Sequence, residues 1–134
     1  MTHLLDSQTI QSRLQACTSK EATFKELVAL SKQLERLTDD DKSEEHKVKG
    51  CESAVWLIEE HIDGLCHFKA DSDAKLMRGV LVAVLSLVQG KSKTDIQTMD
   101  LVQELTQFNL GSYLTSSRTN GVLGILKKLS SQDQ

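Results

Sequence analysis

The chain has 134 residues, of which 39% are hydrophobic and 26% are charged, and its formal net charge is −3. This length is enough for one hydrophobic core without a disulfide or a metal ion to stabilise it. The slightly acidic balance argues against a nucleic-acid-binding protein, which carries a concentrated basic surface. No basic amphipathic segment favours binding to a membrane surface.

The N-terminus has neither the basic start nor the apolar run of a signal peptide. The longest apolar run, residues 80–88, is too short to span a bilayer. Three cysteines, an odd number, form no complete disulfide framework and fit a reducing compartment. We therefore expect a cytoplasmic protein with free thiols.

The first 37 residues have the apolar periodicity of two helices. Apolar residues from Ile10 to Cys17 predict the first helix, which Asp6 or Ser7 can cap. Residues 18–21, Thr-Ser-Lys-Glu, match the capping box that opens a second helix. Its predicted apolar stripe consists of Phe24, Leu27, Val28, Leu34 and Leu37.

The segment 38–47, TDDDKSEEHK, is polar throughout and rich in acidic residues. Runs of charge are usually solvated, so we expect an exposed loop here. A docking surface for a basic partner is the alternative interpretation of the same segment.

A β pattern follows in residues 48–70. Residues 55–58 are rich in β-formers, and Asp63-Gly64 is the signal of a two-residue turn, so a hairpin is predicted with a return strand at 66–70. A third short strand is expected near residues 47–49. Such a turn places residues of both strands on one face: Val55, Leu57, Cys66, Phe68 and Ala70.

Residues 74–89 predict the most apolar helix, with N-caps in Asp71-Ser72-Asp73 and an end at Gly90. Its apolar residues extend most of the way round, which is typical of a central helix. Gly79 in its middle indicates the close approach of another element.

Further helices are expected near residues 94–98, 100–105 and 116–129, the last with Val122, Ile125, Leu126 and Leu129 facing inward. The chain shows no internal repeat, low-complexity tract or linker. It therefore predicts one α+β domain over residues 1–134, a small antiparallel sheet of about three strands covered by helices.

The spacing of potential ligands gives only weak support for a metal site. The chain has no Cys-x-x-Cys and no helical His-x-x-x-His pair, and the neighbours Cys66 and His67 point to opposite faces of a strand. We predict no metal site. An approach of Cys66 to Cys51 as a dithiol pair stays open. A nucleophile pair of Cys51 with a histidine lacks an orienting third group.

Among the cysteines, Cys51 stands apart. Cys17 fits a helical stripe and Cys66 fits a strand, so each is expected to be a small buried hydrophobe. Cys51 instead follows Gly50, which permits a backbone turn that other residues resist. This places Cys51 at a break in the pattern.

The neighbours of Cys51 favour its reactive form. In an extended chain Lys47 and Lys49 lie on its side, and their positive charge favours the thiolate, although the adjacent Glu52 opposes it. The apolar run that follows, residues 54–58, can shelter the thiol, and Trp56 within it is expected in the core. Cys51 is therefore the predicted reactive thiol.

Three blocks of the chain resemble the SufE family of sulfur-acceptor proteins, which includes the CsdE type. They are VKGCESAVWL (48–57), DSDAKLMRGVLVAVL (71–85) and LTSSRTNGVLGIL (114–126), in the family's order and spacing. The likeness covers about residues 7–129. The chain lacks the proline or asparagine common before the cysteine motif and has Val122 where leucine is usual. These differences concern loop rigidity more than chemistry.

The resemblance implies a function as well as a helix-covered antiparallel sheet. Such proteins take persulfide sulfur from a cysteine desulfurase, stimulate that enzyme and pass the sulfur toward iron–sulfur cluster assembly. Cys51 matches the position of the acceptor cysteine in the family motif. The resemblance also implies that Gly50, Glu52 and Arg118 contact the desulfurase. The pyridoxal phosphate belongs to the desulfurase, so no cofactor is expected here, and the chain alone should turn over nothing.

Two other functions stay open. One is a metal or iron–sulfur scaffold that uses Cys17, Cys51 and Cys66. The other is an interaction module with an incidental thiol. The resemblance also leaves open the SufE or CsdE type of donor, the final sulfur recipient and the oligomeric state.

Overall fold

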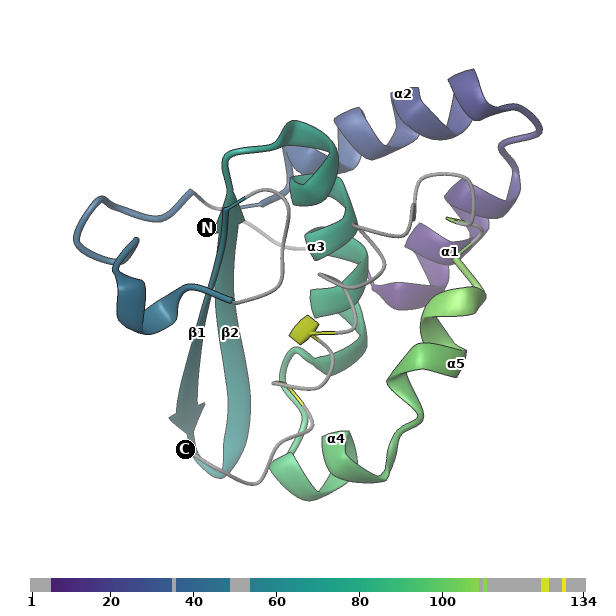
Figure 1. Ribbon diagram of the computed structural model, residues 1–134. Coiled ribbons are helices and arrows are strands. Elements are labelled where there is room, and N and C mark those ends of the chain that lie inside the picture. The colour runs from purple at the N-terminus through teal and green to yellow at the C-terminus, as the bar shows by residue number, and fades with distance from the viewer. Residues whose placement is uncertain are drawn as a thin grey trace.

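The computed structural model describes residues 6–34, 36–48, 54–108, 110, 124, 125 and 129. A two-stranded antiparallel sheet packs on one side of the central helix α3 (Lys75–Val88), and α1 and α5 lie on the other side (Figure 1). The predicted α+β class is confirmed. Among the described residues no helix combines the length and the apolar character needed to cross a bilayer.

Side-chain caps set the starts of the first two helices. The helix α1 (Ser7–Gln15) begins after Asp6, whose carboxylate accepts a hydrogen bond from the Thr9 N–H at 2.7 Å. The helix α2 (Lys20–Ser31) begins after Ser19, whose Oγ accepts from the Ala22 N–H at 3.1 Å. The cap of α2 is therefore one residue later than the predicted capping box.

The predicted stripe of α2 is correct only in part. Leu27 is fully buried, but Phe24 is 44% exposed. The helix ends at Ser31, so Leu34 and Leu37 reach the core from the chain beyond it. The apolar spacing of the sequence thus continues past the true end of the helix.

The predicted hairpin is confirmed. The strands β1 (Val55–Ile62) and β2 (Leu65–Ser72) are joined by Asp63 and Gly64 with φ of 54° and 81°. Two successive residues in the left-handed region form the turn that matches the twist of a hairpin. The predicted inward face is also confirmed, since its members are buried: Val55, Leu57, Cys66, Phe68 and Ala70.

The sheet has two strands where about three were expected, among the residues that the structure describes. The segment before β1 contains a short 3-10 helix, η1 (Glu44–His46), and then one bridge between Lys47 and Trp56. The acidic segment around η1 is mostly exposed, as expected of a loop.

The helix α3 is central, as predicted, because most of its residues are buried against the hairpin and the other helices. It ends just before Gly90, which has a φ of 76°. A Cβ added to Gly79 would lie 2.4 Å from the carbonyl oxygen of Leu27 in α2. Gly79 thus allows the backbones of α2 and α3 to approach closely.

Replacing Gly79 by alanine should destabilise the protein by about 1–3 kcal/mol, because the added methyl group overlaps backbone that has little room to move. At an ordinary site inside a helix the same change stabilises by up to about 1 kcal/mol. The sign of the change in unfolding free energy, measured in urea, therefore tests the contact. An increase in stability would contradict it.

The helices predicted near residues 94–98 and 100–105 are confirmed, each to within one residue. The helix α4 (Lys93–Thr98) is capped by Ser92, and α5 (Leu101–Thr106) is capped by Asp100. Of the predicted inward positions near the C-terminus, Ile125 and Leu129 are helical and fully buried. Val122 and Leu126 lie outside the described residues.

Candidate functional site

The predicted site residues Cys51, Gly50, Glu52 and Arg118 lie outside the described residues. Residues 49–53, which we call the Cys51 segment, are flanked by Val48 and Ala54, and the structure describes both of these flanking residues. Their contacts define the surroundings to which this segment is attached.

Both ends of the Cys51 segment are bonded to the same end of the sheet. The Val48 N–H donates to the Val55 carbonyl at 2.8 Å. The Ala54 carbonyl accepts from Ser72 Oγ at 2.7 Å and from the Asp73 N–H at 3.3 Å. Since Val55 pairs with Ser72, this end of the sheet is the one farthest from the hairpin turn.

A buried ion pair lies at this end of the sheet. The Asp71 carboxylate is fully buried, and Arg36 Nε donates to its oxygens at 2.9 Å. The N–H groups of Leu37 and Ser72 also donate to it, at 3.1 and 2.8 Å. Lys42 Nζ lies 3.4 Å away. This carboxylate therefore joins the chain after α2 to the last residues of β2.

The prediction that Asp71 caps the central helix is wrong. Because β2 continues through Ser72, Asp71 is a strand residue and its carboxylate is engaged by Arg36 and Leu37. The helix α3 starts after Ala74, whose N–H donates to Ser72 Oγ at 3.2 Å.

The prediction that Trp56 belongs to the core is also wrong. Alternation along β1 sends Val55 and Leu57 inward and Trp56 to the outer face, where it is half-buried. Lys42 Nζ lies 5.4 Å from the centre of the Trp56 ring, within the range of a cation–π contact. Lys42 thus contacts both Asp71 and Trp56, which are paired across the two strands.

The surroundings of Asp71 make the stability of the protein depend on acidic pH. Burial raises the pKa of Asp71, but the hydrogen bonds from Arg36, Leu37 and Ser72 outweigh it, so the pKa is lowered overall. A carboxyl group of lowered pKa contributes stability that is present above its unfolded pKa, about 3.9, and is lost as the pH falls through the folded value.

We therefore expect the parent protein to exceed an Asp71→Asn variant in unfolding free energy by a constant amount above about pH 5 and by less below about pH 4. Urea unfolding of both proteins at a series of pH values measures the difference. A difference that grows as the pH falls would contradict the role assigned to the carboxylate.

The two described cysteines are both at least partly covered. Cys66 is buried, as predicted, and burial together with the Glu59 charge raises the pKa of its thiol, although Lys93 opposes this. A protonated, covered thiol is a poor nucleophile. Cys17 is only partly buried, and its Sγ donates to the Arg13 carbonyl at 3.3 Å.

The hairpin also separates Cys66 from the Cys51 segment. Cys66 pairs with His61, six residues along β1 from Val55, which corresponds to about 20 Å. Cys51 is three residues before Ala54, so even a fully extended chain allows at most about 11 Å between the Cα atoms of the two. A disulfide needs Cα atoms within about 7 Å. The geometry of the chain therefore does not favour a Cys51–Cys66 dithiol pair.

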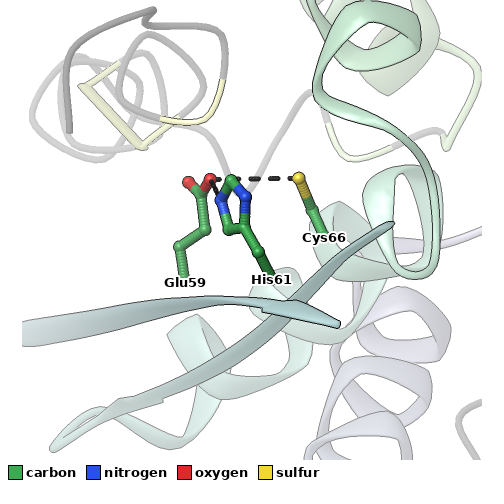
Figure 2. Close-up of side chains that lie close together, drawn as sticks. All are labelled: Glu59, His61 and Cys66. Carbon is green, nitrogen blue, oxygen red and sulfur yellow. Dashed lines mark hydrogen bonds and ion pairs between the residues drawn. The ribbon is translucent and has the colours of Figure 1, made fainter. Parts of the chain in front are cut away.

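The structure brings together one group that was not predicted from the sequence: Glu59, His61 and Cys66 (Figure 2). Lys93 forms an ion pair with Glu59. The signal was present, because the two-residue turn fixes the register and places Glu59, His61 and Cys66 on one face. The contact of Arg36 with Asp71 had no such signal, since 35 residues separate the two.

Comparison with known proteins identifies the family of this chain. The chain matches the family described as "SufE: Fe-S metabolism associated domain" over residues 8–133. It is similar to the "Sulfur acceptor protein CsdE" of Escherichia coli K12, with 30% identity over 119 residues, 87% of this chain and 80% of that protein. An uncharacterized SufE-like protein of Rhizobium etli is 32% identical over 114 residues, 81% of this chain and 76% of that one.

A solved structure shares the fold. The solution structure of a hypothetical protein from Thermus thermophilus has a TM-score of 0.74 with this chain at 13% identity, covering 94% of this chain and 91% of that one. The helix-covered hairpin and the match over nearly the whole length lead to one conclusion: the chain belongs to the SufE family of Fe–S metabolism associated domains.

Proposed function

We propose that this protein is a sulfur acceptor and carrier that takes persulfide sulfur from a cysteine desulfurase onto Cys51. The observation that carries the proposal is the family match over residues 8–133, a range that includes Cys51 and the motif VKGCESAVWL. This motif resembles the acceptor motif of the family, which is why we assign the acceptor role to Cys51. The similarity to a protein named as a sulfur acceptor supports the same role.

The chemistry requires a thiolate that can reach a partner. The Cys51 thiolate attacks the outer sulfur of the desulfurase persulfide, a new sulfur–sulfur bond forms, and the old one breaks. The desulfurase regains its thiolate and Cys51 becomes a persulfide, so no outside oxidant or reductant is needed. A thiolate of the downstream recipient then attacks the outer sulfur of the Cys51 persulfide in the same way.

The described surroundings of the segment are suited to such a role. Val48 and Ala54 are bonded to the sheet, so the attachment points of the Cys51 segment are fixed relative to the core. Arg36 and Arg78 both contact the last residues of β2, the latter through Nη1 and the Ser72 carbonyl at 2.8 Å. Arg36 and Arg78 therefore lie at the end of the sheet to which the Cys51 segment is attached.

Reconstitution with a cysteine desulfurase tests the proposal. With cysteine and a reductant present, adding this protein should raise the rate of sulfide release, and the protein without the desulfurase should release none. A rate that is independent of the protein's concentration would contradict the proposal. Through Gly50, Glu52 and Arg118 we expect contact with the desulfurase, so substitution of Arg118 should raise the concentration needed for half-maximal stimulation.

A scaffold that uses Cys17, Cys51 and Cys66 is the second candidate, and the described part of the fold does not favour it. Cys17 follows α1 on one side of α3, whereas Cys66 lies in β2 on the other side (Figure 1). Protein purified without oxygen should therefore contain neither iron nor acid-labile sulfide. Stoichiometric amounts of both would support the scaffold instead.

A further inference from the structure

Three metal-binding side chains meet near the hairpin turn, at the end of the sheet opposite the Cys51 segment. Glu59 and His61 are alternate residues of β1, so they point to the same face, and Cys66 of β2 lies directly across from His61. Figure 2 shows the three side chains on one side of the hairpin.

Backbone pairing explains why His61 and Cys66 come so close. The Cys66 N–H donates to the Lys91 carbonyl at 2.7 Å, and the Cys66 carbonyl accepts from the Gly90 N–H at 2.8 Å. Both backbone groups of Cys66 therefore point away from β1. This makes His61 and Cys66 a non-hydrogen-bonded pair, the type whose Cα atoms are only about 4.5 Å apart and whose side chains are closest.

The donor atoms are near the spacing of a bound metal ion. One ligand atom from each residue lies within 4.8 Å of the other two. His61 Nε2 is 2.5 Å and Cys66 Sγ is 3.9 Å from Glu59 Oε2. Ligands at about 2.0–2.3 Å from a tetrahedral zinc ion are about 3.3–3.6 Å apart, so small side-chain rotations suffice.

We propose that Glu59, His61 and Cys66 form a zinc-binding site. Thiolate, imidazole and carboxylate are the three ligand types that zinc takes in proteins, whereas magnesium and calcium prefer oxygen alone. Three protein ligands leave the fourth position open to water. This proposal is independent of sulfur transfer at Cys51.

The surroundings give the site both support and access. Lys93 Nζ donates to both Glu59 oxygens, to Oε1 at 3.2 Å and to Oε2 at 3.3 Å, and to the Leu129 carbonyl at 3.0 Å. It can therefore hold the carboxylate through Oε1 when Oε2 takes the metal. Cys66 is 1% exposed, but the His61 side chain is 46% exposed, so solvent reaches the group at His61.

The test uses the full chain with Cys17 and Cys51 both replaced by serine, so that Cys66 is the only thiol. Calorimetric titration with zinc should show one ion per chain. Cobalt, used as a spectroscopic probe of the same site, should show absorption from sulfur-to-metal charge transfer. Replacing Cys66 by serine as well should remove that absorption.

Two further variants keep the test independent of any folding defect at the buried Cys66. His61→Ala, at an exposed position, should weaken zinc binding by at least about 10-fold, and Glu59→Gln should do the same, because loss of a ligand costs no less than loss of its supporting residues. His67→Ala is the matched control, since His67 lies on the opposite face of the same hairpin and should bind zinc as the parent does.

The proposal is overturned if the variant with Cys17→Ser and Cys51→Ser binds no zinc. In that case Glu59, His61, Cys66 and Lys93 would form only a network of hydrogen bonds and ion pairs. It is equally overturned if His61→Ala binds zinc as tightly as His67→Ala.

Discussion

Replacing Cys51 by serine is expected to abolish stimulation of the desulfurase. A serine hydroxyl does not ionise near neutral pH and cannot carry a sulfane sulfur, so the exchange has no acceptor. Sulfide release with the variant should fall to the rate of the desulfurase alone. The measurement is the initial rate of sulfide release at saturating cysteine, with increasing amounts of the variant.

The matched control for this result is Cys17→Ser. Cys17 is partly buried, and its Sγ donates to the Arg13 carbonyl, a hydrogen bond that a serine hydroxyl can also make. This variant should stimulate as the parent does. If Cys51→Ser stimulated equally well, the protein would act as an interaction module and its thiol would be incidental.

Replacing Asp71 by alanine is expected to lower the unfolding free energy by about 2–4 kcal/mol. The change removes the acceptor of the Leu37 and Ser72 N–H groups and leaves Arg36 and Lys42 without their buried partner. The loss should be smaller than for a wholly buried pair, because the Arg36 side chain is 54% exposed and water can solvate it again.

Asp73→Ala is the control for this stability measurement. Asp73 is exposed and lies two residues from Asp71, so removing its carboxylate should change the unfolding free energy by less than about 0.5 kcal/mol. Urea unfolding with an unchanged m-value gives both numbers. Equal effects of the two substitutions would contradict the role of the buried ion pair.

Local signals predicted most of the fold. The Asp63-Gly64 turn set the register of the hairpin and its inward face, since two left-handed residues in succession allow little else. Asp6 marked the start of α1 because its side chain accepts a hydrogen bond from the first turn. Gly79 marked the contact of α2 with α3.

The predictions that were wrong concern residues whose positions depend on contacts with residues far away in the sequence. Trp56 was expected in the core for its hydrophobicity, but its place on the outer face follows from the parity of β1 and the cation of Lys42. Asp71 was expected to cap a helix, because nothing in the sequence shows that Arg36 reaches it. Only the folded chain brings these partners together.

The functional residues also fall into those with a local signal in the sequence and those without one. The motif around Cys51 was found from the sequence through its resemblance to the SufE family, and the family match over residues 8–133 confirms that resemblance, while the role of Cys51 stays a prediction. The proposed zinc ligands Glu59, His61 and Cys66 were not predicted, because they have neither the helical nor the Cys-x-x-Cys spacing of a metal-binding motif. Cross-strand pairs have no fixed spacing in sequence, so they require a register before they can be recognised.

Mass spectrometry of the intact protein tests the central claim most directly, after incubation with a cysteine desulfurase and cysteine and without added reductant. We expect the mass of one added sulfur per chain, which peptide mapping assigns to Cys51 and which is absent from the Cys51→Ser variant. An unmodified protein, or sulfur carried on Cys17 or Cys66 instead, would contradict the account.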